Sequence, residues 1–175
     1  MDAFISSFRF FRRFNIFQQR LLFVPIHKDF HWTLLVVFVE EKTICYYDSC
    51  FGDGDRYLNA MLDCLEREAV VRPNPRAGRP NEPDVMGCPG FNRAKWKLRC
   101  IDRQSMPGQV LGDSYNCGVY VITLMDLISA DLPLLFDHDD IELCRKRLCL
   151  HIIDMKDSDP SDDLESVASD SDDDA

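Results

Sequence analysis

Residues 21–48, LLFVPIHKDFHWTLLVVFVEEKTICYYD, carry the strongest secondary-structure signal in this chain. Three short apolar runs, 21–26, 31–39 and 43–48, are rich in β-branched and aromatic residues. Such runs are typical of strands buried in a sheet. A polar turn, Glu40-Glu41-Lys42, joins the second run to the third. We therefore predict a first strand followed by an antiparallel hairpin.

Helical spacing of apolar residues surrounds this strand-rich centre. Helices are predicted, in chain order, over residues 4–17, 55–71, 117–132 and 141–153. The aromatic face of 4–17 favours a helix packed on the core over one lying on a membrane surface. Residues 72–93 hold five prolines and predict a long exposed loop, and a strand is expected over 94–101. This order predicts an α+β fold with segregated helices.

The negative charge is concentrated at the C-terminus. The chain has 175 residues and a formal net charge of -10, but nine of its 30 acids lie in residues 157–175, which contain no Lys or Arg. The body is therefore almost neutral, which disfavours a nucleic-acid-binding face. We predict one domain over residues 1–156 and an acidic disordered tail over 157–175. The longest apolar run is too short to span a membrane, so no membrane role is expected.

Eight cysteines are present, yet the chain is large enough to fold without disulfides. No signal peptide is recognisable, so we expect reduced thiols in the nucleus or cytoplasm. Cys144, Cys149 and His151 offer ligand types for a metal, but thiols packed along a helix are the more common case. We therefore predict no metal site and no cofactor.

The predicted hairpin brings a histidine and a carboxylate together. A turn centred between Val39 and Glu40 pairs His31 with Asp48, and directly opposed side chains lie about 5 Å apart at Cβ. If the centre of the turn shifts by one residue, His31 and Asp48 become diagonal neighbours instead. In the direct pairing the carboxylate can fix the imidazole tautomer and stabilise its protonated form, and the sequence does not force one register over the other.

Cys117 lies where a polar stretch, residues 112–116, gives way to an apolar helix. A thiolate at a helix N-terminus is stabilised by the helix dipole and by unpaired N–H groups. Gly118 would allow a substrate to approach the backbone closely. Taken alone, such a cysteine is more often a buried structural thiol, whereas a histidine base nearby would make it a nucleophile.

Four segments together resemble the Ulp/SENP family of cysteine proteases specific for SUMO and related ubiquitin-like proteins. They are Val24-Pro25-Ile26-His27, His31-Trp32, Tyr46-Tyr47-Asp48-Ser49 and Asp113-Ser114-Tyr115-Asn116-Cys117-Gly118-Val119-Tyr120-Val121. The likeness runs from about residue 14 to residue 153. It implies a papain-like cysteine protease fold of the Ulp/adenain type that is short at its N-terminus.

The resemblance implies that Cys117 is the nucleophile, His31 the general base and Asp48 the residue that orients it. Trp32, which is otherwise a plain core aromatic, would cover a narrow tunnel for the Gly-Gly end of the substrate. The implied reaction is hydrolysis after that Gly-Gly, in maturation or deconjugation. The implied partner is SUMO or another ubiquitin-like protein, bound by a monomer.

The oxyanion donor departs from the family pattern. The family glutamine is expected six positions before the cysteine, which is Leu111 here, whereas Gln109 lies eight before. A two-residue bulge would restore the position; otherwise Gln109 is a loop residue, and Gln104 is a weaker substitute. Two alternatives thus stay open, a module that binds a ubiquitin-like protein without cleaving it and an acyltransferase on the same fold.

Overall fold

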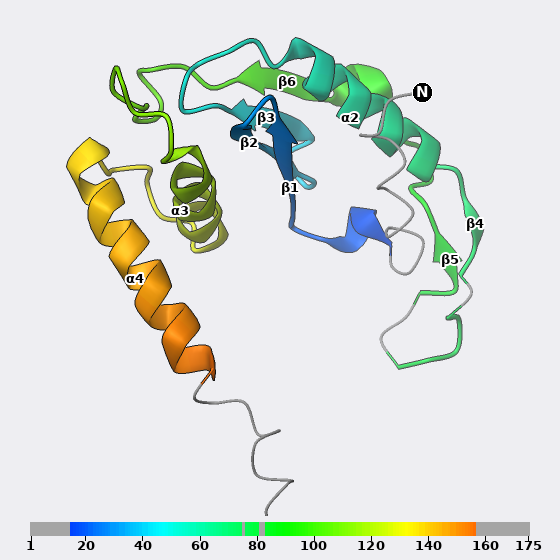
Figure 1. The fold of residues 1–175 in the computed structure, drawn as a ribbon. Coiled ribbons are helices and arrows are strands. Elements are labelled where there is room, and N and C mark those ends of the chain that lie inside the picture. Colours follow the sequence, from blue (N-terminus) through cyan, green and yellow to red (C-terminus); the bar gives the residue numbers. More distant parts are fainter. Residues whose placement is uncertain (1–14, 75, 81–82, 157–175) are drawn as a thin grey trace, which may run out of the picture.

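The computed structural model describes residues 15–74, 76–80 and 83–156, and its centre is a four-stranded sheet (Figure 1). In spatial order the strands are β1 (Leu21–Lys28), β2 (His31–Phe38), β3 (Thr43–Tyr47) and β6 (Lys97–Cys100). The helices are α2 (Asp55–Glu68), α3 (Cys117–Ser129) and α4 (His138–Lys156), with short 3₁₀ turns η2 (Ile16–Gln18) and η3 (Arg93–Lys95). The three strands predicted within residues 21–48 are confirmed.

Helices cover both faces of the sheet. Leu35 and Val37 of β2 pack in a cluster with α2, whereas Leu34 and Val36 pack in a second cluster with α3. All four side chains are fully buried. A strand buried on both faces reads as an uninterrupted apolar run, which explains why β2 lacks the alternation of a half-exposed strand.

The β2–β3 hairpin has a different register from the direct pairing of His31 with Asp48. Phe38 pairs with Thr43 and Leu34 with Tyr47, so the turn is centred between Glu40 and Glu41. The turn closes through a hydrogen bond from Lys42 N to Val39 O, at 3.3 Å. This one-residue shift of the turn centre makes His31 and Asp48 diagonal neighbours, because each shift of one moves the partner by two.

The predicted strand at 94–101 begins later than expected and runs parallel to β3. Residues 93–95 form η3, and only Lys97–Cys100 pair with the sheet, with Cys45 opposite Arg99. The parallel pairing follows from the crossover through α2, since a strand that returns after a helix enters the sheet in the same direction. On the other side of the molecule, α4 lies along α3, where Ile141 packs on Val119 and Tyr120 (Figure 1).

The proline-rich segment is less open than predicted. Its ends pair as two short strands, β4 (Arg72–Pro73) and β5 (Val85–Met86), and the Met86 side chain is buried. Most of the predicted helix at 4–17 and the acidic tail at 157–175 lie outside the described residues. No helix in the described ranges is long and apolar enough to cross a bilayer.

Candidate active site

His31 and Asp48 form a close polar pair at one end of the sheet. The His31 Nε2 atom lies 2.7 Å from Asp48 Oδ1. His31 is the first residue of β2 and follows a tight turn, in which Asp29 and Phe30 both have positive φ. Asp48 follows the last residue of β3 directly. The diagonal register still allows the contact, because a histidine side chain is long enough to reach a diagonal neighbour.

The turn after β3 holds the Asp48 carboxylate in place. The carboxylate accepts hydrogen bonds from Cys50 N at 2.7 Å, from Gly52 N at 3.1 Å and from the Tyr46 hydroxyl at 3.5 Å. A Cβ atom at Gly52 would lie only 2.8 Å from Asp48 Oδ2. The glycine therefore lets the backbone close over the carboxylate, a role that its sequence position alone did not reveal. Asp48 is buried, and His31 is partly exposed.

Cys117 is the first residue of α3, and its side chain is buried. The neighbouring Gly118 faces Trp32: a Cβ atom at Gly118 would lie 3.7 Å from Trp32 Cδ1. Since Trp32 follows His31 and Gly118 follows Cys117, this contact brings the histidine and cysteine segments to the same end of the molecule. Trp32 as a residue is 40% exposed, and its ring lies against the His27 ring, with centroids 4.6 Å apart.

Gln109 reaches into the same region from the loop before α3. Its Oε1 atom accepts from Ser49 Oγ at 2.6 Å, and its Nε2 atom donates to Asp113 O at 3.1 Å. The residues between them form a turn, closed by a bond from Asp113 N to Val110 O at 3.1 Å. Leu111 is fully exposed in this turn. Residues 110–112 thus form a surface turn between Gln109 and Asp113, and the role of Gln109 as oxyanion donor stays a prediction. Among the hydrogen bonds of the described residues, Gln104 makes none to this group.

Cys50 is a residue that the sequence analysis did not place in the site. Its thiol donates to Gln109 Oε1 at 3.4 Å, and its sulfur lies within 4.8 Å of ligand atoms of His31 and Asp48. Burial raises the pKa of this thiol, and negative charge at Asp48 raises it further. Its position in the sequence, two residues after Asp48, could have indicated its place in the site, because Cys50 belongs to the turn that binds the Asp48 carboxylate.

Three further residues support the segment that precedes Cys117. Arg145 of α4 donates to Asn116 Oδ1 at 2.5 Å and to a backbone carbonyl beside it. The Asp113 carboxylate accepts hydrogen bonds from two backbone N–H groups and from the Asn116 amide. Burial raises the pKa of Asp113, but these hydrogen bonds outweigh burial and hold the pKa below its usual value. The Tyr120 hydroxyl donates to Gly108 O at 2.9 Å. The Asp113 bonds are local to the turn, whereas no local pattern predicts the contacts of Arg145 and Tyr120, because they join segments that are separate in the sequence.

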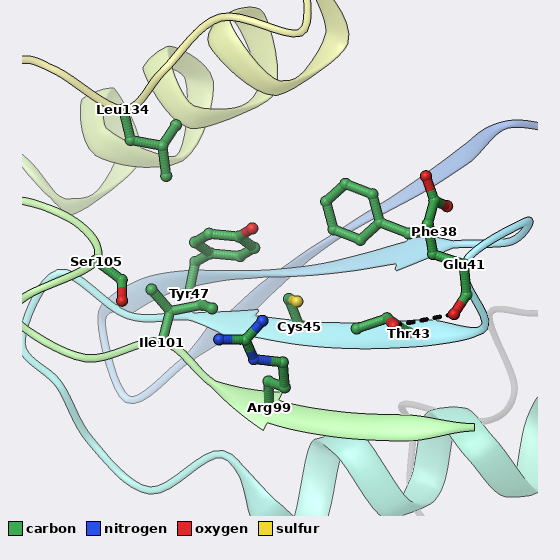
Figure 2. A pocket seen from close by; sticks show the side chains of 9 residues that line it. All are labelled: Phe38, Glu41, Thr43, Cys45, Tyr47, Arg99, Ile101, Ser105 and Leu134. Atoms are coloured by element: carbon green, nitrogen blue, oxygen red, sulfur yellow. Dashed lines mark hydrogen bonds between the residues drawn. The ribbon is translucent and has the colours of Figure 1, made fainter. Parts of the chain in front are cut away.

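A hollow of about 380 Å³ lies elsewhere, on the α3-facing side of β3 and β6 (Figure 2). Figure 2 shows the Arg99 side chain extending from β6 beneath Tyr47 and Cys45, with Leu134 opposite. The hollow is lined by Phe38, Glu41, Thr43, Cys45, Tyr47, Arg99, Ile101, Ser105 and Leu134. None of the predicted site residues lines this hollow. We therefore place the candidate chemistry at the end of the sheet where His31, Asp48 and Gln109 make their hydrogen bonds.

Two groups in the described part of the chain have a spacing that suits a metal ion. One is His31, Asp48 and Cys50; the other is Asp53, Asp55 and Cys100, all exposed. The trio considered from sequence, Cys144, Cys149 and His151, does not form such a group among the described residues. All eight cysteines lie in the described ranges and are free.

Comparison with known proteins identifies the family. The profile of the Ulp1 protease family, C-terminal catalytic domain, matches residues 2–159. Human sentrin-specific protease 2 is 27% identical over 139 residues, which cover 79% of this chain and 21% of that protein. The putative ubiquitin-like-specific protease 1B of Arabidopsis thaliana is 31% identical over 137 residues, which cover 78% of this chain and 35% of that protein. The chain thus spans about a fifth to a third of the length of these relatives.

Solved structures agree on the fold. The SUMO protease Ulp1 with its catalytic cysteine oxidised to a sulfonic acid superposes with a TM-score of 0.60 at 24% identity, covering 81% of this chain and 57% of that one. The Ulp1 protease domain in complex with Smt3, the yeast SUMO, gives 0.54 at 21% identity, covering 81% and 55%. The α+β fold of the Ulp type that the sequence predicted is confirmed, and the chain belongs to the Ulp1 protease family.

Proposed function

We propose that this chain is a cysteine protease that cleaves after the C-terminal Gly-Gly of SUMO or a related ubiquitin-like modifier. The single observation that carries the proposal is the 2.7 Å contact between His31 Nε2 and Asp48 Oδ1, at the end of the molecule where α3 begins with Cys117. Membership of the Ulp1 protease family supports the same reaction.

In the proposed mechanism the Cys117 thiolate attacks the scissile carbonyl, and His31 protonates the leaving amine. Water then attacks the thioester, with His31 as the base. Because Asp48 binds Nε2 of the imidazole, Nδ1 is the nitrogen left to exchange a proton with the sulfur. The carboxylate stabilises the imidazolium that forms, as in other acyl-transfer triads.

Gln109 is the proposed oxyanion donor. Its Nε2 atom carries two hydrogens, and the bond to Asp113 O uses only one of them. The bond from Ser49 Oγ fixes which way the amide faces. A donor held by such contacts can stabilise the tetrahedral oxyanion without reorganising, and each such donor typically contributes about 10²–10³ in rate.

The substrate slot is proposed to run between Trp32 and Gly118. A Cβ atom at position 118 would meet Trp32 Cδ1 at 3.7 Å, an ordinary contact distance, so a slot bounded by these two residues is narrow and suits a substrate end made of glycines. The names of the relatives point to the same class of substrate, since they are sentrin-specific and ubiquitin-like-specific proteases. The solved Ulp1 complex with Smt3 adds a precedent for the docking of a folded modifier.

The remaining parts of the proposal concern organisation and setting. We propose residues 1–156 as the protease domain, acting as a monomer, and residues 157–175 as a separate acidic tail. Eight free thiols suit a reducing compartment, the nucleus or cytoplasm. No partner beyond the ubiquitin-like protein and its conjugates is required.

The test is a panel of fluorogenic substrates, each a ubiquitin-like modifier with a reporter on its C-terminal glycine. We expect turnover of the SUMO substrate by the wild type and none by Cys117→Ala. A SUMO vinyl sulfone should form a covalent adduct with the wild type only. Reversible binding without turnover or adduct would instead identify a binding module, and a reaction that requires acetyl-CoA would identify an acyltransferase.

A further inference from the structure

We propose that His31, Asp48 and Cys50 form a binding site for a borderline-soft divalent cation of the Zn²⁺ type, and that the bound ion blocks the active site. One ring nitrogen of His31, one carboxylate oxygen of Asp48 and the Cys50 sulfur all lie within 4.8 Å of one another. The imidazole–thiolate–carboxylate set matches the ligands that zinc takes in proteins.

The spacing of the three atoms suits tetrahedral coordination. Zinc bonds of about 2.0–2.3 Å put ligand atoms about 3.3–3.8 Å apart around the ion. The hydrogen-bonded pair of His31 and Asp48, at 2.7 Å, would have to open by only about 0.5 Å to reach that geometry. Since His31 is partly exposed, its ring can make this small movement without disturbing the packed core.

The surroundings supply both an entry path and an outer shell. Cys50 is exposed, so a hydrated ion can reach the thiol from solvent. The backbone N–H groups of Cys50 and Gly52 hold the Asp48 carboxylate in place, whereas the hydrogen bond from the Cys50 thiol to Gln109 Oε1 is given up when the thiol loses its proton. Such outer contacts fix the orientation of metal ligands.

The charges that face Cys50 favour a cation. The nearby groups that carry or can take a negative charge are Asp48, the Cys117 thiol and Asp113, and the opposing positive group is Arg103. The Arg103 guanidinium lies over the Phe51 ring, 4.5 Å from its centroid, which directs part of its charge toward an aromatic face. Coordination releases the Cys50 proton to solvent and leaves a thiolate, so the bound ion meets two negative ligands and one neutral one.

Occupancy would stop catalysis through His31. An imidazole whose lone pair is bound to a metal cannot accept a proton, and the ion also separates it from Asp48. This inhibitory consequence rests on the proposed protease function, whereas binding of the ion does not. The site differs from a simple Cys117–His31 chelate because it uses a thiol that takes no part in the proposed reaction.

The test measures binding on Cys117→Ser, which cannot react and cannot supply that thiolate. We expect one Co²⁺ per chain to give a thiolate-to-cobalt charge-transfer absorption, and Zn²⁺ to displace it. In Cys117→Ser/Cys50→Ser the absorption should vanish, and Zn²⁺ affinity measured by calorimetry should fall at least about 10- to 100-fold, a loss that even outer-shell changes cause.

The matched control is Cys117→Ser/Cys100→Ser, which removes an exposed thiol from the other metal-spaced group. It should keep both the absorption and the affinity. Persistence of the signal without Cys50, its loss without Cys100, or no thiolate absorption in Cys117→Ser would overturn the inference. Because these readouts need no turnover, a failure of the proposed function would appear separately, as an inactive wild type in the metal-free substrate assay.

Discussion

Gln109 Nε2 donates a hydrogen bond to the backbone carbonyl of Asp113 at 3.1 Å, across the turn that precedes the candidate nucleophile. The bond closes a loop whose middle residues project into solvent. It keeps the glutamine beside Ser49 and Cys50 even though its distance in sequence from Cys117 differs from the family pattern. The position of the amide therefore depends on the turn as much as on the glutamine.

We expect Gly112→Ala to reduce kcat by up to about 10²–10³-fold, the contribution of one oxyanion donor. Gly112 has φ +92°, and no atom lies within 4 Å of a Cβ built there, so the cost comes from the backbone alone. A residue with a Cβ relaxes out of this conformation and moves the Gln109 amide. Steady-state kinetics measures the effect.

The matched controls for that change are Gly78→Ala and Gly90→Ala. Both glycines have positive φ and open space around the built Cβ, but they lie in the proline-rich segment. They should lower the midpoint of thermal unfolding without changing kcat. An equal fall in kcat for all three variants would show that the turn at Gly112 has no special role in catalysis.

Asp48→Asn should lower turnover by about 10²–10⁴-fold, because an amide cannot stabilise the imidazolium and can hold the wrong tautomer. The structure adds a cost in stability, since the new NH₂ group competes with the N–H donors of Cys50 and Gly52. We expect a loss of about 1–3 kcal/mol in the free energy of unfolding, measured by urea titration.

Asp102→Asn provides the comparison for Asp48→Asn. The Asp102 side chain accepts backbone N–H bonds from Gln104 and Ser105 in a similar turn, without a histidine partner. This variant should keep wild-type turnover. Near-normal activity of Asp48→Asn itself would remove Asp48 from the mechanism.

Gly118→Ala should separate stability from activity. The added methyl meets Trp32 Cδ1 at an ordinary contact distance of 3.7 Å, and alanine favours a helix over glycine by about 0.5–1 kcal/mol. We therefore expect unchanged or higher stability, with a lower kcat/KM because the methyl narrows the proposed slot. Trp32→Phe in the same chain should restore part of the loss, and purely additive effects would argue against a shared slot.

Tyr120→Phe should loosen the loop that carries Gln109. The variant loses the 2.9 Å bond to Gly108 O, at a cost of about 0.5–1.5 kcal/mol. Burial, followed by negative charge at Asp113, raises the pKa of Tyr120 to about 12. The native state thus holds this proton more tightly than the unfolded state, whose tyrosine has a pKa of about 10.

The higher pKa of Tyr120 in the native state makes the free energy of unfolding depend on pH in the alkaline range. The contribution of Tyr120 is complete below about pH 10 and is lost as the pH rises toward about 12. Denaturation curves across this range should show a smaller loss of stability in the phenylalanine variant than in the wild type. Identical slopes for the two proteins would mean that this hydroxyl is equally accessible in both states.

The sequence predicted the strands and helices well because burial leaves a local pattern. β2 is apolar at every position from Leu34 to Val37, and α3 begins where a polar stretch meets an apolar one. The sequence did not predict the register of the hairpin. The register depends on which hydrogen bond closes the turn, here from Lys42 N to Val39 O, and the polar residues at 40–42 are compatible with more than one turn centre.

The sequence by itself determined the candidates for chemistry, His31, Asp48 and Cys117, and the chain order in which they occur. Only the tertiary structure decided the neighbours of those groups: the diagonal contact of His31 with Asp48, the placement of Gln109 and the presence of Cys50 beside them. The physical reason is that secondary structure follows from local burial, whereas contacts within a few ångströms depend on turn closure and on packing between distant segments.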